Sequence, residues 1–332
     1  MTVETMAETT PATVAEAAYI DHPSGFFSLS ERNQRFTAEG VEGFIAYREQ
    51  GKHWVLFGGV NAHPDQQGPL LDAFIEAARQ KRRHFVAVQV REHQIDLFRK
   101  RGATVNQLGA SFAITLADYT YVGTKKMKLR NKIKRARKAG CTVVEIGRDI
   151  PRDEAAFDQV RKISELWLKD LGHKELDFMI GEIGGTDDQL RRVFLVRDKE
   201  DQPVAFITYV PSWGSRSGFL HDLTRKVPRA PTGAMELCNS FAMDRMKEEG
   251  IGYLHFGFTP FIVEGEEPEG HSPFMAWLVR KLLTHGKAIY PAESQAKYKT
   301  KWGTDVIDRE YIAAKPLSLR AAWDLMRLTR SL

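Results

Sequence analysis

The order of the expected strands and helices is the feature that most constrains the fold of this chain. Residues 43–60 have the pattern of a β-hairpin that turns near Gly51. After it, helices are expected at 69–81 and 92–102 and strands at 84–90 and 111–116. A second hairpin, turning at Asp201 and Gln202, is expected at 193–210, after a helix at 152–170. Strands at 217–223 and 253–258 and helices at 235–250 and 273–286 follow. A hairpin that leads into alternating helices and strands therefore occurs twice, which predicts an α/β fold of two similarly built domains or one large domain.

A strongly basic segment, KKMKLRNKIKRARK at 125–138, lies between the two runs. It holds nine Lys and Arg and no Asp or Glu, whereas the rest of the chain has 39 Lys and Arg against 43 Asp and Glu. In a helix, Leu129, Ile133 and Ala136 form one narrow apolar stripe. Thr124 is placed as an N-cap and Gly140 as a stop. The segment predicts a helix with one thin face against protein.

Two interpretations of the basic helix stay open. It is either a solvated surface helix or a binding surface for a polyanion, such as nucleic acid or anionic lipid headgroups. Like charges at this density repel one another, and phosphates would relieve that repulsion. The bases that would contact nucleic acid are Lys125, Lys126, Lys128, Arg130, Lys132, Lys134, Arg135, Arg137 and Lys138.

Length and composition favour two domains of a globular protein. We divide the 332 residues into a flexible tail (1–20), an N-terminal domain (21–123), the connecting helix (124–140) and a C-terminal domain (141–332). No apolar run approaches the roughly 20 residues that cross a bilayer, and the first residues lack a secretory signal. We therefore expect a cytoplasmic protein, in which Cys141 and Cys238 form no disulfide.

Common catalytic and cofactor motifs do not occur in the sequence. It contains no G-x-G-x-x-G after a strand, no P-loop, no G-x-S-x-G and no H-E-x-x-H. The ten histidines are scattered without the spacing of metal ligands. We expect no metal site and no cofactor.

Polar residues in the second half are the candidates for a site. Asp222 and Arg225 end an expected strand that leads into a Pro-rich loop, which is where α/β proteins place binding groups. A simple salt bridge between them is the alternative. Ser164 and Glu165 lie near the end of the helix at 152–170, whose expected buried residues are Phe157, Val160, Ile163 and Trp167.

Six blocks of sequence in order resemble one known family. They are LGASFAITLADYTYVGTKKMKLRNKIKRARKAGCTVVEIG, SELWLKDLGHKELDFMIG, QPVAFITYVP, HDLTR, PTGAMEL and LHFGFTPF. They look like the C-terminal catalytic domain of bacterial phosphatidylglycerol lysyltransferases, which also occurs in stand-alone relatives such as the seryl-tRNA-dependent transferase of valanimycin biosynthesis. The resemblance covers roughly residues 25 to 315. It implies two tandem GNAT-like domains, of the acetyltransferase fold, joined by a positively charged helix.

The resemblance also implies an activity, the transfer of an amino acid from an aminoacyl-tRNA to an acceptor. The family's Asp-x-x-Arg pair matches Asp222 and Arg225, which we take as catalytic. Its Ser-Glu element matches Ser164 and Glu165. The family usually has D-L-M-R where this chain has D-L-T-R, and M-D where it has Met235-Glu236. The substrate-binding residues expected in all are Ser164, Glu165, Glu175 and Phe178.

The chemistry of an aminoacyl ester suits these residues, because the ester is already activated and needs only positioning and charge stabilisation. Asp222 is assigned to the α-ammonium of the aminoacyl group or to a proton of the acceptor, and Arg225 to a phosphate or the developing oxyanion. The basic helix is expected beside this pair, where it would follow the acceptor stem of the tRNA.

The acceptor is expected to be a small molecule, since the lipid-modifying members carry a membrane domain that this sequence does not contain. A hydroxyl, hydroxylamine or amine would be its nucleophile, and natural-product biosynthesis its setting. Three alternatives remain: a lipid headgroup as acceptor, acyl-CoA as donor, or a noncatalytic tRNA-binding protein. For acyl-CoA, the loop RAPTGA at 229–234 misses the pyrophosphate-binding pattern by one position. Peripheral contact with anionic lipid is also allowed, and the sequence says nothing of the oligomeric state.

Overall fold

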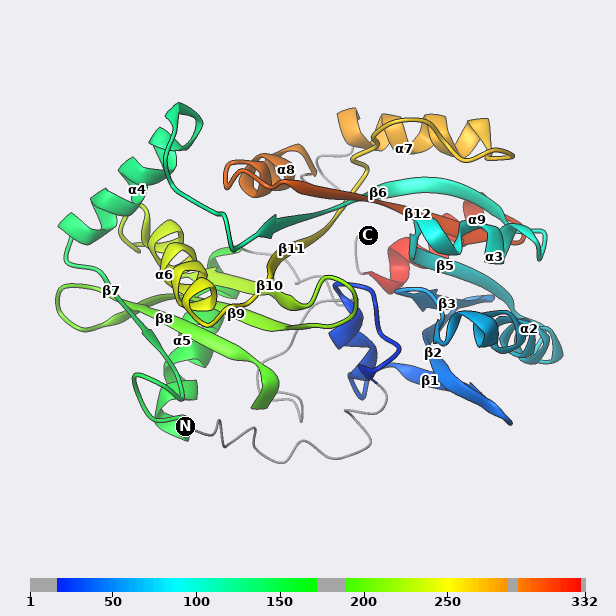
Figure 1. Cartoon of the computed structure of the whole chain (residues 1–332), viewed down its shortest axis with the longest axis horizontal. Coiled ribbons are helices and arrows are strands. Elements are labelled where there is room, and N and C mark those ends of the chain that lie inside the picture. The colour runs from blue at the N-terminus through cyan, green and yellow to red at the C-terminus, as the bar shows by residue number, and fades with distance from the viewer. Residues whose placement is uncertain (1–16, 172–188, 286–291, 330–332) are drawn as a thin grey trace.

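A computed structural model describes residues 17–171, 189–285 and 292–329 of the chain. Their strands form one sheet in the order β1-β2-β3-β5-β12-β6-β11-β10-β9-β8-β7, with β4 paired to β2. The sheet extends along the long axis of the molecule, with helices on both faces (Figure 1). The fold is α/β, as the order of elements predicts.

The elements have the following bounds. The strands are β1 (Gln34–Ala38), β2 (Val41–Gln50), β3 (His53–Phe57), β4 (Asn61–Ala62), β5 (His84–Arg91), β6 (Thr104–Thr115), β7 (Thr142–Glu145), β8 (Arg192–Arg197), β9 (Pro203–Ser212), β10 (Gly218–Lys226), β11 (Tyr253–Pro260) and β12 (Val306–Ala314). The α-helices are α2 (Pro64–Gln80), α3 (Ile95–Arg99), α4 (Met127–Lys138), α5 (Glu154–Leu171), α6 (Ala234–Glu248), α7 (Pro273–His285), α8 (Ala292–Thr300) and α9 (Leu319–Leu328). Short 3-10 helices are η1 (Gly25–Leu29), η2 (Glu92–Gln94) and η3 (Thr124–Lys126).

The two predicted hairpins are both present. Strands β2 and β3 pair around Gly51, whose φ of +57° suits glycine. Strands β8 and β9 pair around a turn in which Asp198 accepts hydrogen bonds from the backbone N–H groups of Glu200 and Gln202. The helices and strands expected between and after the hairpins are confirmed, with shifts of their ends.

The end of the chain completes the sheet of its first half. Strand β12 lies between β5 and β6 and pairs antiparallel with both. Helix α9 follows it, and its Asp324 lies 2.7 Å from Nδ1 of His53 on β3. The sequence analysis assigns no element to residues 292–328, which form α8, β12 and α9. The division of the chain into tandem GNAT-like domains remains a prediction.

Side chains that alternate along the strands bury both faces of the sheet, as in α/β proteins. Strand β8 is an example, because Val193 and Leu195 pack with α5 residues while Phe194 and Val196 pack with α4 and α6 residues. We call these two sides of the sheet the α5 face and the α6 face. The short helix η1 packs on the α5 face, near the middle of the sheet, where Val210 and Leu220 belong to its core cluster.

The basic segment forms helix α4, which packs on α6. Its buried residues are Leu129, Ile133 and Ala136, so the predicted apolar stripe is confirmed. Thr124 is not the N-cap of α4. It is the first residue of the 3-10 helix η3, and α4 begins three residues later, at Met127. Gly140 has a φ of +80° just after the helix, as expected of a stop.

Candidate active site at the parting of β10 and β11

Asp222 lies at a β-bulge in β10. The pairing of β10 with β9 shifts between His221 and Thr224, so that Asp222 and Leu223 stand opposite the single residue Thr208. The hydroxyl of Thr208 accepts a hydrogen bond from the N–H of Leu223 at 3.0 Å, which fills the gap in the ladder. Bulges of this kind redirect a side chain and are frequent beside active sites.

The carboxylate of Asp222 is held by Arg191, which precedes β8. The two side chains form an ion pair and are each only 3% exposed. Arg191 also donates to the hydroxyl of Thr208 at 3.2 Å. Arg191 thus lies beside the buried carboxylate as a compensating charge and fixes the direction of the Asp222 side chain.

Arg225 lies further along β10, on the same face as Asp222. It pairs in register with Phe206, which packs with α5. Its side chain is mostly buried, and the guanidinium carbon lies 5.2 Å from the ring centre of Trp167 on α5. A guanidinium over an indole is a favourable cation–π contact. The two predicted catalytic residues therefore both belong to the α5 face.

The sheet divides beside these residues. Strands β10 and β11 are parallel, and their pairing covers three residue pairs and ends at Leu220 and His255. Beyond that point β10 continues beside β9, while β11 continues beside β6. Strands that part in this way leave an opening in the sheet whose two edges carry side chains from both faces. Ligands of α/β proteins bind at such interruptions of strand order.

On the α6 face, the opening is lined by an aromatic group around His221. The centre of its ring lies 5.4 Å from that of Tyr209, 5.6 Å from Phe256 and 6.1 Å from Tyr298. Burial lowers the pKa of His221 to about 3, and the nearby ammonium of Lys299 contributes. The imidazole is neutral at pH 7 and lies 3.3 Å, through Nε2, from the hydroxyl of Thr224.

A line of charged contacts joins the basic helix to this aromatic group. Lys132 of α4 lies 2.9 Å from Glu236 of α6, and Lys301 lies 2.9 Å from the same carboxylate oxygen. The ammonium of Lys301 lies 3.9 Å from the ring centre of Tyr298, which borders His221. Burial raises the pKa of Glu236, but the two ammonium groups outweigh it, and the net shift is downward.

Lys299 lies buried at the β11 edge of the opening. Its ammonium donates to the backbone carbonyls of Gly257 and Phe258, each at 2.8 Å. Burial lowers its pKa to about 7, against a smaller opposing effect of Glu310. The ammonium group thereby lies against the backbone of β11.

The basic helix does not lie beside Asp222 and Arg225, and this expectation from the sequence is wrong. Helix α4 packs on α6 and so covers the α6 face, whereas the pair lies on the α5 face. The reason is that successive side chains of a strand point to opposite faces of the sheet. On β10, His221 therefore lies on the α6 face and Asp222 on the α5 face.

The other predicted substrate-binding residues are not gathered at the opening. The hydroxyl of Ser164 is buried and donates to the carbonyl of Val160 in its own helix at 3.0 Å. Glu165 is exposed on α5. Glu175 and Phe178 lie outside the described residues. For all four, a role in binding remains a prediction.

The residues that sequence reasoning missed are Arg191, Lys299 and Lys301. Arg191 has no local signal, because its partner is on another strand. The run Y-K-T-K-W at 298–302, in which aromatic residues flank two lysines, is a pattern that could have pointed to the other two.

The nine bases at 125–138 fall into two groups. Three of them hold the helix in place: Lys126 donates to the carbonyl of Thr120, Arg130 donates to those of Tyr121 and Gly123, and Lys132 pairs with Glu236. The others are exposed, and the side chains of five of these make no hydrogen bond or ion pair with any described residue: Lys125, Lys128, Lys134, Arg135 and Lys138. Their role in binding nucleic acid remains a prediction.

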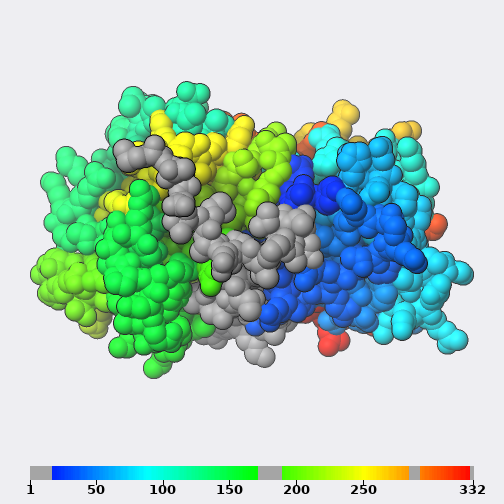
Figure 2. Space-filling view, turned by 60° about the horizontal axis from the view of Figure 1, so that its bottom comes forward, coloured from blue at the N-terminus to red at the C-terminus, as the bar shows by residue number. Residues whose placement is uncertain are grey.

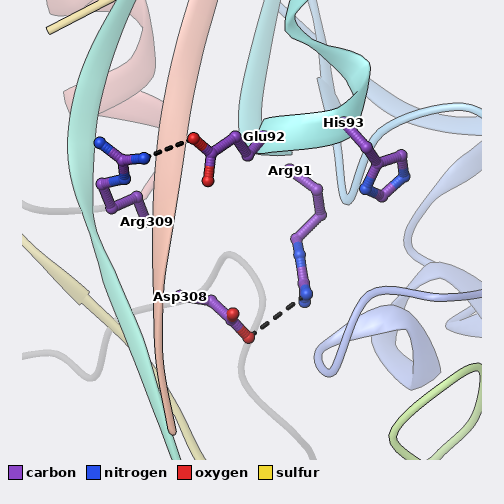
Figure 3. A pocket seen from close by; sticks show the side chains of 5 residues that line it. All are labelled: Arg91, Glu92, His93, Asp308 and Arg309. Atoms are coloured by element: carbon purple, nitrogen blue, oxygen red, sulfur yellow. Dashed lines mark hydrogen bonds and ion pairs between the residues drawn. The ribbon is translucent and has the colours of Figure 1, made fainter.

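A cavity of about 390 Å³ is lined by residues of β5, η2 and β12. Figure 3 shows its five lining residues, with Arg91 paired to Asp308 and Glu92 paired to Arg309. The fifth is His93, whose pKa is lowered, mainly by burial. The cavity contains none of the predicted site residues, and its charges are already paired.

Two further features bear on the chemistry. Within the described ranges, no group of three or more His, Cys, Asp or Glu side chains is arranged to hold a metal ion. In the same ranges, no helix combines the length and the apolar character needed to cross a bilayer. That the reaction needs no metal or cofactor remains a prediction.

Comparison with known families identifies the class of protein to which this fold and candidate site belong. The family model described as "Phosphatidylglycerol lysyltransferase, C-terminal" matches residues 14–314. The chain belongs to this family, as the resemblance in sequence predicts, and the family's description as a transferase agrees with the predicted enzyme class.

Solved structures share the fold over nearly the whole chain. The structure of L-PGS from Bacillus licheniformis has a TM-score of 0.80 at 19% identity and covers 99% of both chains. The C-terminal domain of a protein described as a lysylphosphatidylglycerol synthetase from Agrobacterium fabrum has a TM-score of 0.78 at 20% identity, covering 95% of this chain and 93% of that one.

Curated relatives match over a shorter stretch. The lysylphosphatidylglycerol biosynthesis bifunctional protein LysX of Mycobacterium marinum is 29% identical over 212 residues, or 62% of this chain. The chain spans only 19% of the length of that relative.

Proposed function

We propose that this protein transfers an aminoacyl group from an aminoacyl-tRNA to a hydroxyl or amine of an acceptor, at the opening between β10 and β11. The observation that carries the proposal is the line of contacts from Lys132 through Glu236 and Lys301 to Tyr298. It joins a helix with exposed, uncompensated bases to the place where the sheet divides. Family membership supplies the class of reaction.

The tRNA approaches from the α6 face in this proposal. The exposed bases of α4 contact phosphates of the acceptor stem, which positions the nucleic acid without reading its sequence. The single-stranded 3′ end then runs along Lys301 toward Tyr298 and His221. Aromatic rings there offer stacking surfaces for a terminal base.

The acceptor approaches from the α5 face. Asp222 and Arg225 lie on that side, beside Trp167 and η1. In this proposal Arg225 binds an anionic group such as a phosphate or the developing oxyanion. Asp222 orients the nucleophile or the α-ammonium of the aminoacyl group.

The reaction balances without an outside reagent. The acceptor oxygen or nitrogen forms a bond to the ester carbonyl carbon, and the bond from that carbon to the ribose oxygen breaks. The proton lost by the nucleophile is gained by the ribose oxygen. The protein therefore has to bring the two reactants together and stabilise negative charge at the carbonyl oxygen.

Two acceptor classes remain candidates. One is a soluble small molecule with a hydroxyl, hydroxylamine or amine, as expected from the sequence. The family name and the LysX relative favour the headgroup of phosphatidylglycerol. Both carry a nucleophile that fits the same step.

Binding of tRNA tests the donor side. Replacing Lys134, Arg135 and Lys138 by Ala removes three exposed bases that hold nothing in place. We expect affinity for aminoacyl-tRNA, measured by fluorescence anisotropy, to fall roughly tenfold or more at moderate salt. The slope of log affinity against log salt concentration should decrease in magnitude by up to about three, since up to three fewer counterions are released.

The matched control replaces Lys52, Lys81 and Lys100 by Ala, three exposed bases on the N-terminal half, at the other end of the molecule from α4 (Figure 1). It lowers the net charge equally and should leave affinity close to that of the wild type. Equal loss in both variants would mean that the chain binds tRNA only through its net charge.

A further inference from the structure

His221 and Thr224 lie on the same face of β10, although side chains three positions apart in a regular strand point to opposite faces. The β-bulge between them changes this count. His221 stands opposite Tyr209 in β9, and Thr224 stands opposite Ile207, which is two positions from Tyr209. Both partners belong to the core cluster on the α6 face. The bulge therefore brings a hydroxyl and an imidazole together, with 3.3 Å between Thr224 Oγ1 and His221 Nε2.

A second hydrogen bond orients the imidazole. It joins the ring to the backbone of His221 itself and favours the protonated ring, and Nδ1 is the ring nitrogen that lies next to this backbone. A neutral imidazole carries one proton. With that proton on Nδ1, the lone pair of Nε2 is left to accept from the hydroxyl of Thr224. A hydroxyl, a base in contact with it and a third group that holds the base are the parts of a proton-transfer site.

The surroundings keep the imidazole of His221 neutral. Burial among three aromatic rings is the main reason why its pKa falls to about 3. The ammonium groups of Lys299 and Lys301 act in the same direction. At pH 7 the ring is therefore uncharged, and its Nε2 lone pair is available to a donor.

The hydroxyl of Thr224 has capacity for a further hydrogen bond. Among the residues that the structure describes, its only hydrogen-bond partner is His221. A hydroxyl has one donor and two acceptor sites, so an acceptor site remains for the O–H or N–H group of a substrate. The hydroxyl of Tyr209, in contrast, already donates to Asn239 at 2.5 Å. Thr224 is half-buried, not enclosed.

Both side chains stand where β10 has lost its parallel neighbour. The pairing of β10 with β11 ends at Leu220 and His255, and His221 follows directly. In the proposed transfer reaction, this is where the ester of the aminoacyl group is placed. Thr224 and His221 lie on the α6 face, from which the tRNA approaches in that proposal.

We propose that Thr224 and His221 form the proton relay of the transfer reaction. The hydroxyl of Thr224 accepts the proton of the attacking O–H or N–H group while its own proton passes to Nε2 of His221. As the ester bond breaks, Nε2 returns a proton through Thr224 to the ribose oxygen. The negative charge that develops at the carbonyl oxygen stabilises the ring while it holds the proton.

No bond forms between Thr224 and the aminoacyl group, and the pair ends the reaction as it began. The inference rests on the proposed function and names the path of the proton that this function requires.

Single-turnover transfer by variants of Thr224 tests the relay. Thr224→Val removes the hydroxyl with almost no change in shape and should slow transfer roughly 100-fold or more, with affinity for aminoacyl-tRNA unchanged. Thr224→Ser keeps the hydroxyl and should retain most of the rate. Heavy water should slow the wild type more than Thr224→Val, because the relay moves its protons in the rate-limiting step. The matched control is Thr142→Val, at an exposed position of β7, which should behave as the wild type.

Nitrogen NMR of the imidazole, without substrate, separates the relay from the reaction. The neutral ring should carry its proton on Nδ1, and the Nε2 resonance should shift in Thr224→Val. A proton on Nε2, or an Nε2 resonance that this substitution leaves unchanged, would overturn the relay whatever the activity. So would full transfer by folded Thr224→Val, or a Thr224→Ser variant as slow as Thr224→Val. A wild type that transfers from no charged tRNA would instead overturn the proposed function, and the relay with it.

Discussion

The ammonium of Lys132, in the basic helix α4, lies 2.9 Å from the carboxylate of Glu236 in the first turn of α6. The same carboxylate oxygen accepts from Lys301 at 2.9 Å. Lys132 therefore holds α4 against α6. Through Glu236 it is also linked to Lys301, which lies near the end of the pairing between β10 and β11. The contact separates bases that maintain structure from bases that remain for a ligand.

Replacing Glu236 by Gln should destabilise the fold. Lys301 is partly buried. Burial lowers its pKa, and the carboxylate of Glu236 opposes this by stabilising the ammonium form. We expect the free energy of unfolding to fall by about 1–3 kcal/mol, the usual effect of leaving a buried group without its partner. Urea unfolding measures it, with Glu248→Gln, an exposed residue of the same helix, as control. Equal stability of the two variants would contradict a structural role for this contact.

Gly233 is expected to be essential for the packing of α4 on α6. It caps α6 with a φ of +92°, and a Cβ there would lie 2.1 Å from the carbonyl oxygen of Lys132. Gly233→Ala should therefore cost more than the roughly 1 kcal/mol or so of backbone strain alone. Gly250→Ala is the matched control, because Gly250 has a φ of +76° and open space around it. Thermal unfolding compares them, and similar losses would mean that the close approach is unimportant.

Asp222→Asn should be both inactive and less stable. The substitution leaves the buried guanidinium of Arg191 without its counter-charge, which costs about 3 kcal/mol or more. The double variant Arg191→Met, Asp222→Leu removes both charges and should recover most of the stability. Chemical denaturation and transfer activity are measured on both. If the double variant is active, Asp222 serves the fold alone; we expect it to be stable and inactive.

Lys299 should make stability depend on pH. Its pKa falls from 10.5 to about 7 on folding, so between these values the unfolded chain binds more protons than the folded one. The free energy of unfolding then rises with pH across this window, by up to about 1.4 kcal/mol per pH unit. Below pH 7 both states are protonated and the effect is flat.

Comparison with Lys299→Met isolates this effect, since other groups that titrate between pH 7 and 10 are common to both proteins. The difference in unfolding free energy between wild type and variant, measured by urea at several pH values, should change steadily in favour of the wild type as pH rises. A difference that does not vary with pH would show that Lys299 keeps an ordinary pKa.

The fold could be anticipated where local pattern decides it. The alternation of hairpins, helices and strands gave the α/β class, and the spacing of Leu129, Ile133 and Ala136 identified the buried side of α4. Strand β12 was missed because its place between β5 and β6 depends on pairing with residues about 200 positions away. Periodicity within a segment carries no information on such a partner.

The candidate site could be predicted only in part from the sequence, because contacts between residues distant in the chain determine it. Asp222 and Arg225 remain predicted site residues, and the structure places both on β10, beyond the point where its pairing with β11 ends. Their orientation relative to the basic helix was predicted incorrectly, because the β-bulge and the parity of β10 decide which face each side chain takes. In the space-filling view (Figure 2), the segment that contains α5 (green) and the N-terminal strands (blue) lie toward opposite ends of the molecule.

Acceptor-dependent deacylation of aminoacyl-tRNA tests the central claim most directly. The protein is mixed in single turnover with a panel of charged tRNAs, and with either phosphatidylglycerol vesicles or a set of soluble hydroxyl and amine compounds. The account predicts that one charged tRNA loses its amino acid only when a suitable acceptor is present, and that the labelled amino acid appears on that acceptor. Transfer from an acyl-CoA with every charged tRNA left intact would contradict it.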